Sequence, residues 1–389
     1  MKTLTVLLLA TTAFAATPAE IAIEKAQADI AKHPDHPPYY NALAMAYARR
    51  ARETSDVQYY AKAEATLQRS FVLAPDNYEG LKTRAWIQLG NHEFAQALHT
   101  ATQLNQKMPD DVIVYGYLAD ANTELGNYKE AVAAAQWMLD LRAGNIPGLT
   151  RAAYQRELHG NLSGALELMQ MAYDATPSSE TEDRAWIWTQ MAHLNLVAGD
   201  LSKAEMYANE ALGLFPGYHY ALGALAQVRI AQEHYDDAVT LLRRRYSAAP
   251  HAENLYALAE ALELAGQTDE SKKAFEEFER KSLAETNIAD NSNHELIAYY
   301  VDHAHQPAKA LEVAKREVER RKDVFTLDCY AWALAANGAY EKADAQIQKA
   351  LQVGVKDRKI LSHADFIARH LNAAGKAEVA RDAAARHCE

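Results

Sequence analysis

The sequence has few of the residues that mark turns, disulfides or sheets. Its 389 residues include two cysteines, 16 glycines and 11 prolines, and only 9% are aromatic. Two cysteines cannot form a disulfide-dense framework. A β-sandwich or barrel needs a turn-forming residue about every 8–12 residues, which so few glycines and prolines do not supply. With hydrophobic residues at 49% and much alanine, the composition therefore predicts a helical protein.

Positive charge is also scarce. Forty Lys and Arg stand against 52 Asp and Glu, which gives a net charge of -12. No basic stripe occurs, so a phosphate-binding groove for nucleic acid is not expected. After the N-terminus no apolar run is long enough to span a bilayer. The length exceeds an ordinary single domain of about 100–200 residues, which leaves several domains or a repeat array.

The first fifteen residues have the pattern of a signal peptide. Lys2 is followed by an apolar stretch over 4–9, and Ala13-Phe14-Ala15 is a small-x-small cleavage site. We expect cleavage after Ala15 and a periplasmic or secreted protein. Such a compartment would permit a disulfide between Cys329 and Cys388, but their separation in space does not follow from the sequence. Two free thiols are the alternative.

A period of 34 residues organises the rest of the chain. Alanine recurs at this spacing, usually with an aromatic or leucine three residues before it and often with a proline twelve residues after it. Later copies contain small residues or threonine in the same register. The small residues of the period are Ala63, Ala97, Ala131, Ala165, Ala204, Ala238, Ser271, Ala310, Ala343 and Ala380. Such self-similarity indicates a stacked repeat architecture.

Each copy is predicted to form a helical hairpin. Within 112–143, apolar residues fall at helical spacing, Gly126-Asn127 interrupts them, and a second helical face follows. Small residues such as Ala119 and Ala131 suit the point where two helix axes approach closely. One hairpin cannot cover its own apolar face, so neighbouring hairpins must stack.

The pattern resembles the tetratricopeptide repeat (TPR) family. The residues that occupy its frame most closely are Trp188, Met191, Ala192, Asn195, Leu201, Ala204, Ala208, Ala211 and Pro216. The resemblance implies an all-α, right-handed solenoid of about ten hairpins over 16–389. We expect a capping helix at 16–34, about nine repeats over 36–355, and a degenerate C-terminal repeat at 356–389 divided at Gly375. An insertion in the first hairpin predicts a longer polar turn over 52–57.

Catalytic and cofactor motifs are missing from the sequence. The nearest candidate for a phosphate loop, 158–161, lacks a lysine and a preceding strand. His294-Glu295 begins like a zinc-protease helix, but Ala298 stands where the second histidine must be. We therefore expect a non-enzymatic protein without a cofactor.

One group of residues keeps a metal-dependent alternative open. Asp302, His303 and His305, with His294 one helix earlier, combine a carboxylate with imidazoles. They could form the site of a metal-binding protein or a metal-dependent hydrolase. The simpler interpretation is a polar turn with solvated histidines, which needs no metal.

The family resemblance implies that the first helices of the hairpins line a concave groove in which a partner protein or peptide binds. The inward positions are Tyr117, Asp120, Glu124, Arg151, Tyr154, Glu157, Trp186, Gln190, His193, Tyr220, Gln227, Tyr256, Glu260, Glu263, Glu295, Tyr299, Asp328 and Trp332. Aromatic and acidic side chains dominate this set, which suits a basic or aromatic-containing partner segment. Only Arg151 and Arg369 could grip a C-terminal carboxylate, so that ligand is disfavoured. The main hypothesis is an interaction scaffold of the cell envelope, and a self-assembling structural component is a further alternative.

Overall fold

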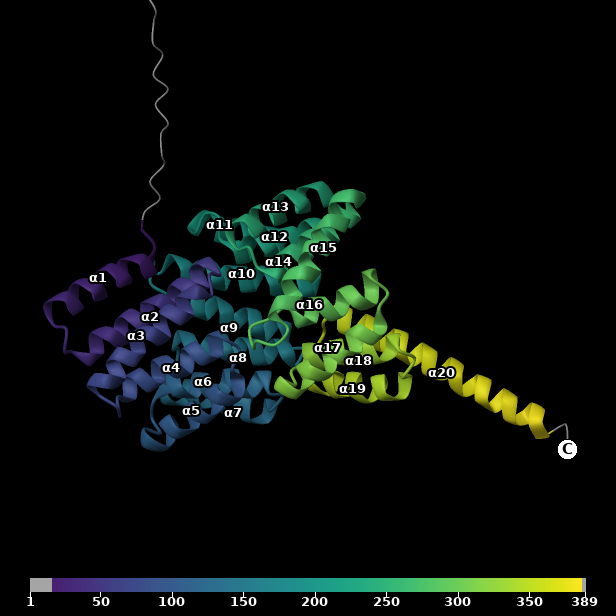
Figure 1. The fold of residues 1–389 in the computed structure, drawn as a ribbon, viewed down its shortest axis with the longest axis horizontal. Coiled ribbons are helices and arrows are strands. Elements are labelled where there is room, and N and C mark those ends of the chain that lie inside the picture. Colours follow the sequence, from purple (N-terminus) through teal and green to yellow (C-terminus); the bar gives the residue numbers. More distant parts are fainter. Residues whose placement is uncertain (1–15, 387–389) are drawn as a thin grey trace, which may run out of the picture.

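The computed structural model describes residues 16–386, with side chains described through 372. The predicted signal peptide, residues 1–15, and Cys388 lie outside the described residues. Within 16–386 all regular secondary structure is helical (Figure 1). The all-α repeat solenoid predicted from the 34-residue period is confirmed.

The described chain begins with a single helix, α1 (Pro18–Lys32). The hydroxyl of Thr17 accepts a hydrogen bond from the backbone N–H of Glu20 at 3.3 Å, and the Glu20 carboxylate accepts one from the N–H of Thr17 at 2.9 Å. This capping box satisfies two N–H groups that the helix itself leaves unpaired. Pro18 occupies the first turn, where no intrahelical N–H bond is lost.

Nine helical hairpins follow α1. They are α2 (Pro37–Thr54) with α3 (Gln58–Leu73), α4 (Tyr78–Gly90) with α5 (Phe94–Lys107), α6 (Val112–Glu124) with α7 (Tyr128–Leu141), α8 (Ile146–Leu158) with α9 (Leu162–Ala175), α10 (Thr181–Ala198) with α11 (Leu201–Leu214), α12 (His219–Ala231) with α13 (Tyr235–Ala248), α14 (Ala252–Leu264) with α15 (Thr268–Glu285), α16 (Asn293–Ala298) and its π-helical continuation η1 (Tyr299–His303) with α17 (Pro307–Arg320), and α18 (Val324–Ala336) with α19 (Tyr340–Val353). A last helix, α20 (Arg358–Arg386), extends away from the body (Figure 1).

Small residues hold the two helices of each hairpin together. Ala63, Ala97, Ala131 and Ala165 have no exposed surface, and Ala204, Ala238, Ala310 and Ala343 are equally buried. Each lies on the second helix of its hairpin. A larger side chain at such a crossing would push the helix axes apart, because the interior is already close-packed. The 34-residue alanine period is thus the mark of repeated helix packing.

Two local features differ from the sequence prediction. The α20 helix continues through Gly375, where the sequence predicted a break between two helices. In the first hairpin the additional residues lengthen α2 as far as Thr54, so the turn to α3 is shorter than the predicted 52–57 segment. Ser55 makes this turn with a left-handed backbone, at a φ of 56°.

The hairpins form a superhelix that returns onto itself. Residues about 196 positions apart meet: the ring of His251 donates to the carbonyl of Ser55, and the backbone N–H of Val324 donates to the Tyr128 hydroxyl at 2.8 Å. In each case the loop between the two helices of an early hairpin contacts the beginning of the first helix of a later hairpin. We call this line of contacts the seam. It brings the later hairpins beside the first ones (Figure 1).

Candidate functional site

The first helices of several neighbouring hairpins pack side by side, α2 with α4, α4 with α6, α6 with α8 and α10 with α12, and we call the surface of the first helices the inner face. Polar pairs connect these helices from one hairpin to the next, and the last pair connects α18 to α20; the paired residues are about one repeat apart. The pairs are Asp120–Arg151 at 2.5 Å, Glu157–His193 at 2.7 Å, Glu263–His303 at 3.0 Å, Asp302–Trp332 at 2.8 Å and Asp328–His363 at 2.8 Å. We call this series the inner ladder. Most of its members are predicted groove positions, whereas Asp302 and His303 were considered for a metal site and His363 was not predicted.

The predicted groove residues differ in how much surface they expose. Tyr117, Tyr256 and Asp328 are buried in the hairpin packing. His193, Gln227 and Glu263 are exposed. The remaining residues are half-buried: Asp120, Glu124, Arg151, Tyr154, Glu157, Trp186, Gln190, Tyr220, Glu260, Glu295, Tyr299 and Trp332. The inner face therefore offers carboxylates and aromatic rings at intermediate depth.

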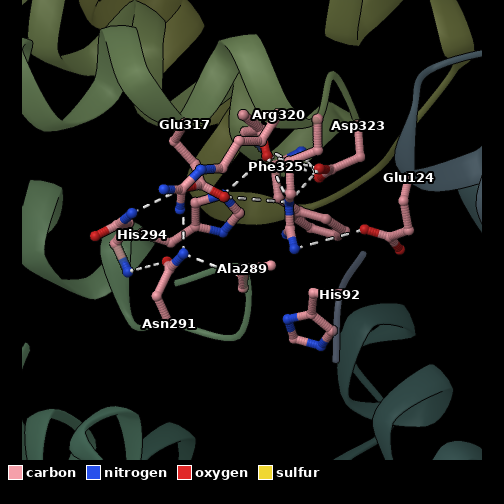
Figure 2. A network of polar contacts seen from close by, with 12 residues as sticks. His92, Glu124, Ala289, Asn291, His294, Glu317, Arg320, Asp323 and Phe325 are labelled. Atoms are coloured by element: carbon pink, nitrogen blue, oxygen red, sulfur yellow. Dashed lines mark hydrogen bonds and ion pairs between the residues drawn. The ribbon is translucent and has the colours of Figure 1, made fainter. Parts of the chain in front are cut away.

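Arg321 is the centre of a polar network at the seam. Its Nε donates to the Asp323 carboxylate at 2.9 Å and to the Thr326 hydroxyl at 3.0 Å, and its Nη1 lies 3.7 Å from the Glu124 carboxylate (Figure 2). Asp323 also caps α18, accepting from the backbone N–H groups of Phe325 and Thr326. The network thus connects the end of α6 to the start of α18.

Sequence reasoning missed Arg321 and Asp323. An aspartate directly before the apolar run that begins at Val324 is a helix N-cap signal, and it could have identified Asp323. Nothing in the sequence indicates that Arg321 meets Glu124, because 197 residues separate them. The pKa of Asp323 is lowered: burial alone would raise it, but Arg321 outweighs that effect.

Several inner carboxyl groups have raised pKa values. Burial raises the pKa of Glu124 to about 7, although Arg321 acts in the opposite direction. Burial and the neighbouring Glu253 raise the pKa of Glu295 to about 7. Such groups are part protonated at neutral pH, and an incoming cation would favour their charged form. Burial also lowers the pKa of His294 to about 3, so its imidazole is neutral.

A cavity of about 400 Å³ lies between the two superhelical turns. On one side its wall comes from the turns after α2 and α4, and on the other from the start of α14 and the 285–292 segment. The side chains that matter for its chemistry are Arg52, Tyr60, His92, Tyr220, Glu285 and Asp290. Of these the sequence analysis named Tyr220 alone, because the others become neighbours only through the superhelical return.

The side chains of the 302–305 turn contact different partners. Asp302 accepts a hydrogen bond from the indole N–H of Trp332, and His303 lies between Glu260 and Glu263 at 3.7 and 3.0 Å. His305 is exposed, with a φ of 52°. Among the described residues no group of three or more His, Cys, Asp or Glu side chains is arranged to hold a metal ion.

Comparison with known proteins gives evidence on fold. No family model matches the sequence, and no curated protein matches it. The structure of the human IFIT1 dimer with PPP-AAAA is similar, with a TM-score of 0.53, 11% identity, and coverage of 87% of this chain and 95% of that one. A monomeric IFIT1 mutant with Gppp-AAAA matches at a TM-score of 0.53 and 13% identity, covering 81% of this chain and 80% of that one.

The structure of the APC/C hetero-tetramer Cut9-Hcn1 is also found, with a TM-score of 0.47 and 11% identity. The match covers 84% of this chain but only 55% of the length of that one. At these identities the likeness concerns the path of the helices. Within the part of the chain that the structure describes, no helix has the length and apolar character needed to cross a membrane.

Proposed function

We propose that this chain, which has the fold of tetratricopeptide-type repeat proteins, is a non-enzymatic scaffold that holds a segment of a partner protein on its inner face. The observation that carries the proposal is the inner ladder. Its members His193 and Glu263 are exposed, and Gln227 is a further exposed position that the sequence predicts for the same face. A stacked helical array offers such an extended surface to an elongated ligand.

The chemistry of the inner face favours a basic partner segment with aromatic residues. Glu295 would gain charge as a cation approaches, because burial keeps it partly protonated, whereas Glu124 already lies beside Arg321. Arginine is the best-suited partner side chain, since its planar guanidinium pairs with two carboxylate oxygens at once. Half-buried rings such as Trp186 and Tyr299 would supply apolar contact area.

A polyanionic ligand fits this surface poorly. The IFIT1 structures contain PPP-AAAA and Gppp-AAAA, and a ligand of that type needs unpaired cations. Here Arg151 is paired with Asp120 and Arg321 with Asp323, while the whole chain has a net charge of -12. This charge balance disfavours a triphosphate ligand.

The proposed location is the cell envelope or the exterior, and this part of the proposal depends on residues 1–15. Fractionation of cells that produce the full chain tests it. Accumulation of the mature form, starting at Ala16, outside the cytoplasm supports export. Replacement of Ala13 and Ala15 by large residues should block processing, whereas a cytoplasmic, unprocessed wild-type chain would contradict the proposal.

Site-specific photo-crosslinking tests the scaffold proposal. A crosslinking residue replaces Gln227 or Glu263 on the inner face, and Glu210, an exposed residue of the second helix α11, serves as the control position. The proposal expects one partner to be captured from both inner positions and not from Glu210. Capture at Glu210 alone would overturn it. Capture of a second copy of this chain would replace it with the self-assembly alternative.

A further inference from the structure

The cavity at the seam is large enough for a small ligand. Its volume of about 400 Å³ falls in the usual range of ligand pockets, about 300–1,000 Å³. It lies between elements far apart in sequence, the turns near 55 and 92 and the segment 285–292. The inner-ladder residues proposed above to contact a partner segment do not line it.

Three carboxyl groups line the cavity, together with the Arg52 guanidinium and the imidazoles of His92 and His251. Glu253, Glu285 and Asp290 contribute carboxylates, and Glu253 has Arg245 at 3.8 Å. Within residues 16–372, whose side chains are described, no lysine or arginine forms an ion pair with Glu285 or Asp290. Asp290 instead has the His92 ring at 3.5 Å.

The basic groups around these carboxylates offset their charge only in part. His251 and Lys281 act on Glu285 without forming an ion pair with it. Arg52 pairs with Asp183 at 2.5 Å and with Glu182, so its charge is already balanced. Burial lowers the pKa of His92 below its usual range despite the neighbouring Asp290, so its ring is neutral at pH 7. A cation entering the cavity would therefore meet two carboxyl groups that form no ion pair with a lysine or arginine among the described residues, and it would favour the ionised form of Glu285, whose pKa burial raises.

Aromatic and aliphatic groups complete the wall. Tyr60 and Tyr220 line it, and the faces of aromatic rings attract organic cations. Burial raises the pKa of both phenols, which keeps them neutral. Val57 and Ile288 provide apolar surface for the methylene groups of a ligand. This combination suits a cation attached to a short carbon chain.

Two unusual backbone positions adjoin the cavity. Five hairpins place a glycine at the left-handed position of their turn, whereas Ser55, His92, Glu233 and His305 occupy it in the other four. Of these four residues, Ser55 and His92 line the cavity. A left-handed backbone is strained for a non-glycine residue, and such strain gathers at functional positions.

We propose that this cavity binds an organic cation, a guanidinium or alkylammonium group on a short carbon chain. The group can belong to a free small molecule or to an arginine or lysine side chain of a bound protein. In the second case the inference rests on the proposed scaffold function, and in the first it is independent of it.

Calorimetric titration with butylguanidinium and with its neutral isostere butylurea tests the proposal. We expect the wild-type chain to bind the guanidinium and not the urea. The double variant Glu285→Gln/Asp290→Asn should bind at least about tenfold more weakly, whereas Glu130→Gln/Glu210→Gln, which removes the same charge from exposed helix positions, should bind like wild type. Thermal melting confirms that each variant is folded.

A second variant changes the space and not the charge. Val57→Trp would fill the cavity from its partly exposed wall and should abolish guanidinium binding. The peptide N-acetyl-Gly-Arg-Gly-amide, titrated in parallel, distinguishes the two sources of the cation. If the peptide binds and the same variants weaken it, the site takes a protein side chain. If butylguanidinium binds and the peptide does not, the site takes a small molecule. Equal binding of butylurea, or binding unaffected by both cavity variants, would overturn the proposal.

Discussion

Individual carboxyl groups should make the proposed partner binding depend on pH. The pKa of Glu295 is about 7, raised by burial and by Glu253, with Lys359 and Arg321 acting in the opposite direction. A basic segment interacts better with the ionised form, so its affinity should rise between pH 6 and pH 8. One such group changes its ionised fraction by up to about tenfold over that interval. Fluorescence anisotropy with an arginine-rich peptide measures this, and Glu295→Gln should flatten the pH profile. A profile that falls with pH would contradict this assignment.

The buried Glu182 is a residue on which the seam depends. It has no exposed surface, accepts a hydrogen bond from the Tyr218 hydroxyl at 2.6 Å and pairs with Arg52. Glu182→Ala leaves the hydroxyl and part of the guanidinium without a partner, which should lower the free energy of unfolding by about 2–4 kcal/mol. Urea denaturation measures the loss.

The control for that change is Glu270→Ala, which removes an ion pair with Arg243 at 2.5 Å. About half of each side chain is exposed there, and exposed pairs contribute about 0–1 kcal/mol. Equal shifts of the two unfolding midpoints would show that Glu182 does not stabilise the seam.

The sequence predicted the buried residues correctly where the same position recurs in every repeat. The period of Ala97, Ala131 and Ala165 marked fully buried helix crossings, because each copy faces the same packing constraint. It failed for Glu182 and Arg321. Their partners come from another superhelical turn, and no local periodicity records a contact across 130 or 197 residues.

At the scale of elements, the turn between α6 and α7 packs closely against the residues that precede α18. Gly126, in the turn between α6 and α7, has a φ of 78°, and an added Cβ would lie 2.7 Å from the Lys322 carbonyl oxygen. Gly126→Ala should therefore add a collision at the seam to the cost of a left-handed alanine. We expect a loss of stability and faster amide hydrogen exchange at 321–324.

Gly266→Ala is the matched control for that substitution. Gly266 has a similar φ of 71°, but an added Cβ there meets nothing within 4 Å. It should cost only the backbone strain, about 1–2 kcal/mol. If both variants lose the same stability and exchange alike at 321–324, the close approach of Gly126 to Lys322 is unimportant.

Helix boundaries could be predicted where a cap or a breaking residue has a physical role. The capping box at Thr17 and the start of α17 at Pro307 follow from the sequence. Gly375 was expected to end a helix, but α20 continues through it. Glycine lowers helix propensity by only about 1 kcal/mol, which a long helix can tolerate.

At the scale of the molecule, the repeat period predicts stacking but not the return of the superhelix. Stacking follows from the apolar faces of single hairpins, which neighbours must cover. The return depends on the small rotation between successive hairpins, accumulated over about 196 residues. No residue pattern at the 34-residue scale specifies that sum, so the cavity at the seam could not be anticipated.

The seam should make unfolding more cooperative than in an open solenoid. In a linear array each repeat contacts only its neighbours, so a local lesion loosens a local region. Here Arg49 and Arg52 of α2 pair with Glu180 and Asp183 at the start of α10. Arg49→Ala/Arg52→Ala should therefore speed hydrogen exchange both in α2–α3 and at 180–183, while α18–α19 keeps its protection. Arg243→Ala, at an exposed pair on α13, should leave both regions unchanged. Faster exchange confined to α2–α3 would mean that the two turns touch without stabilising each other.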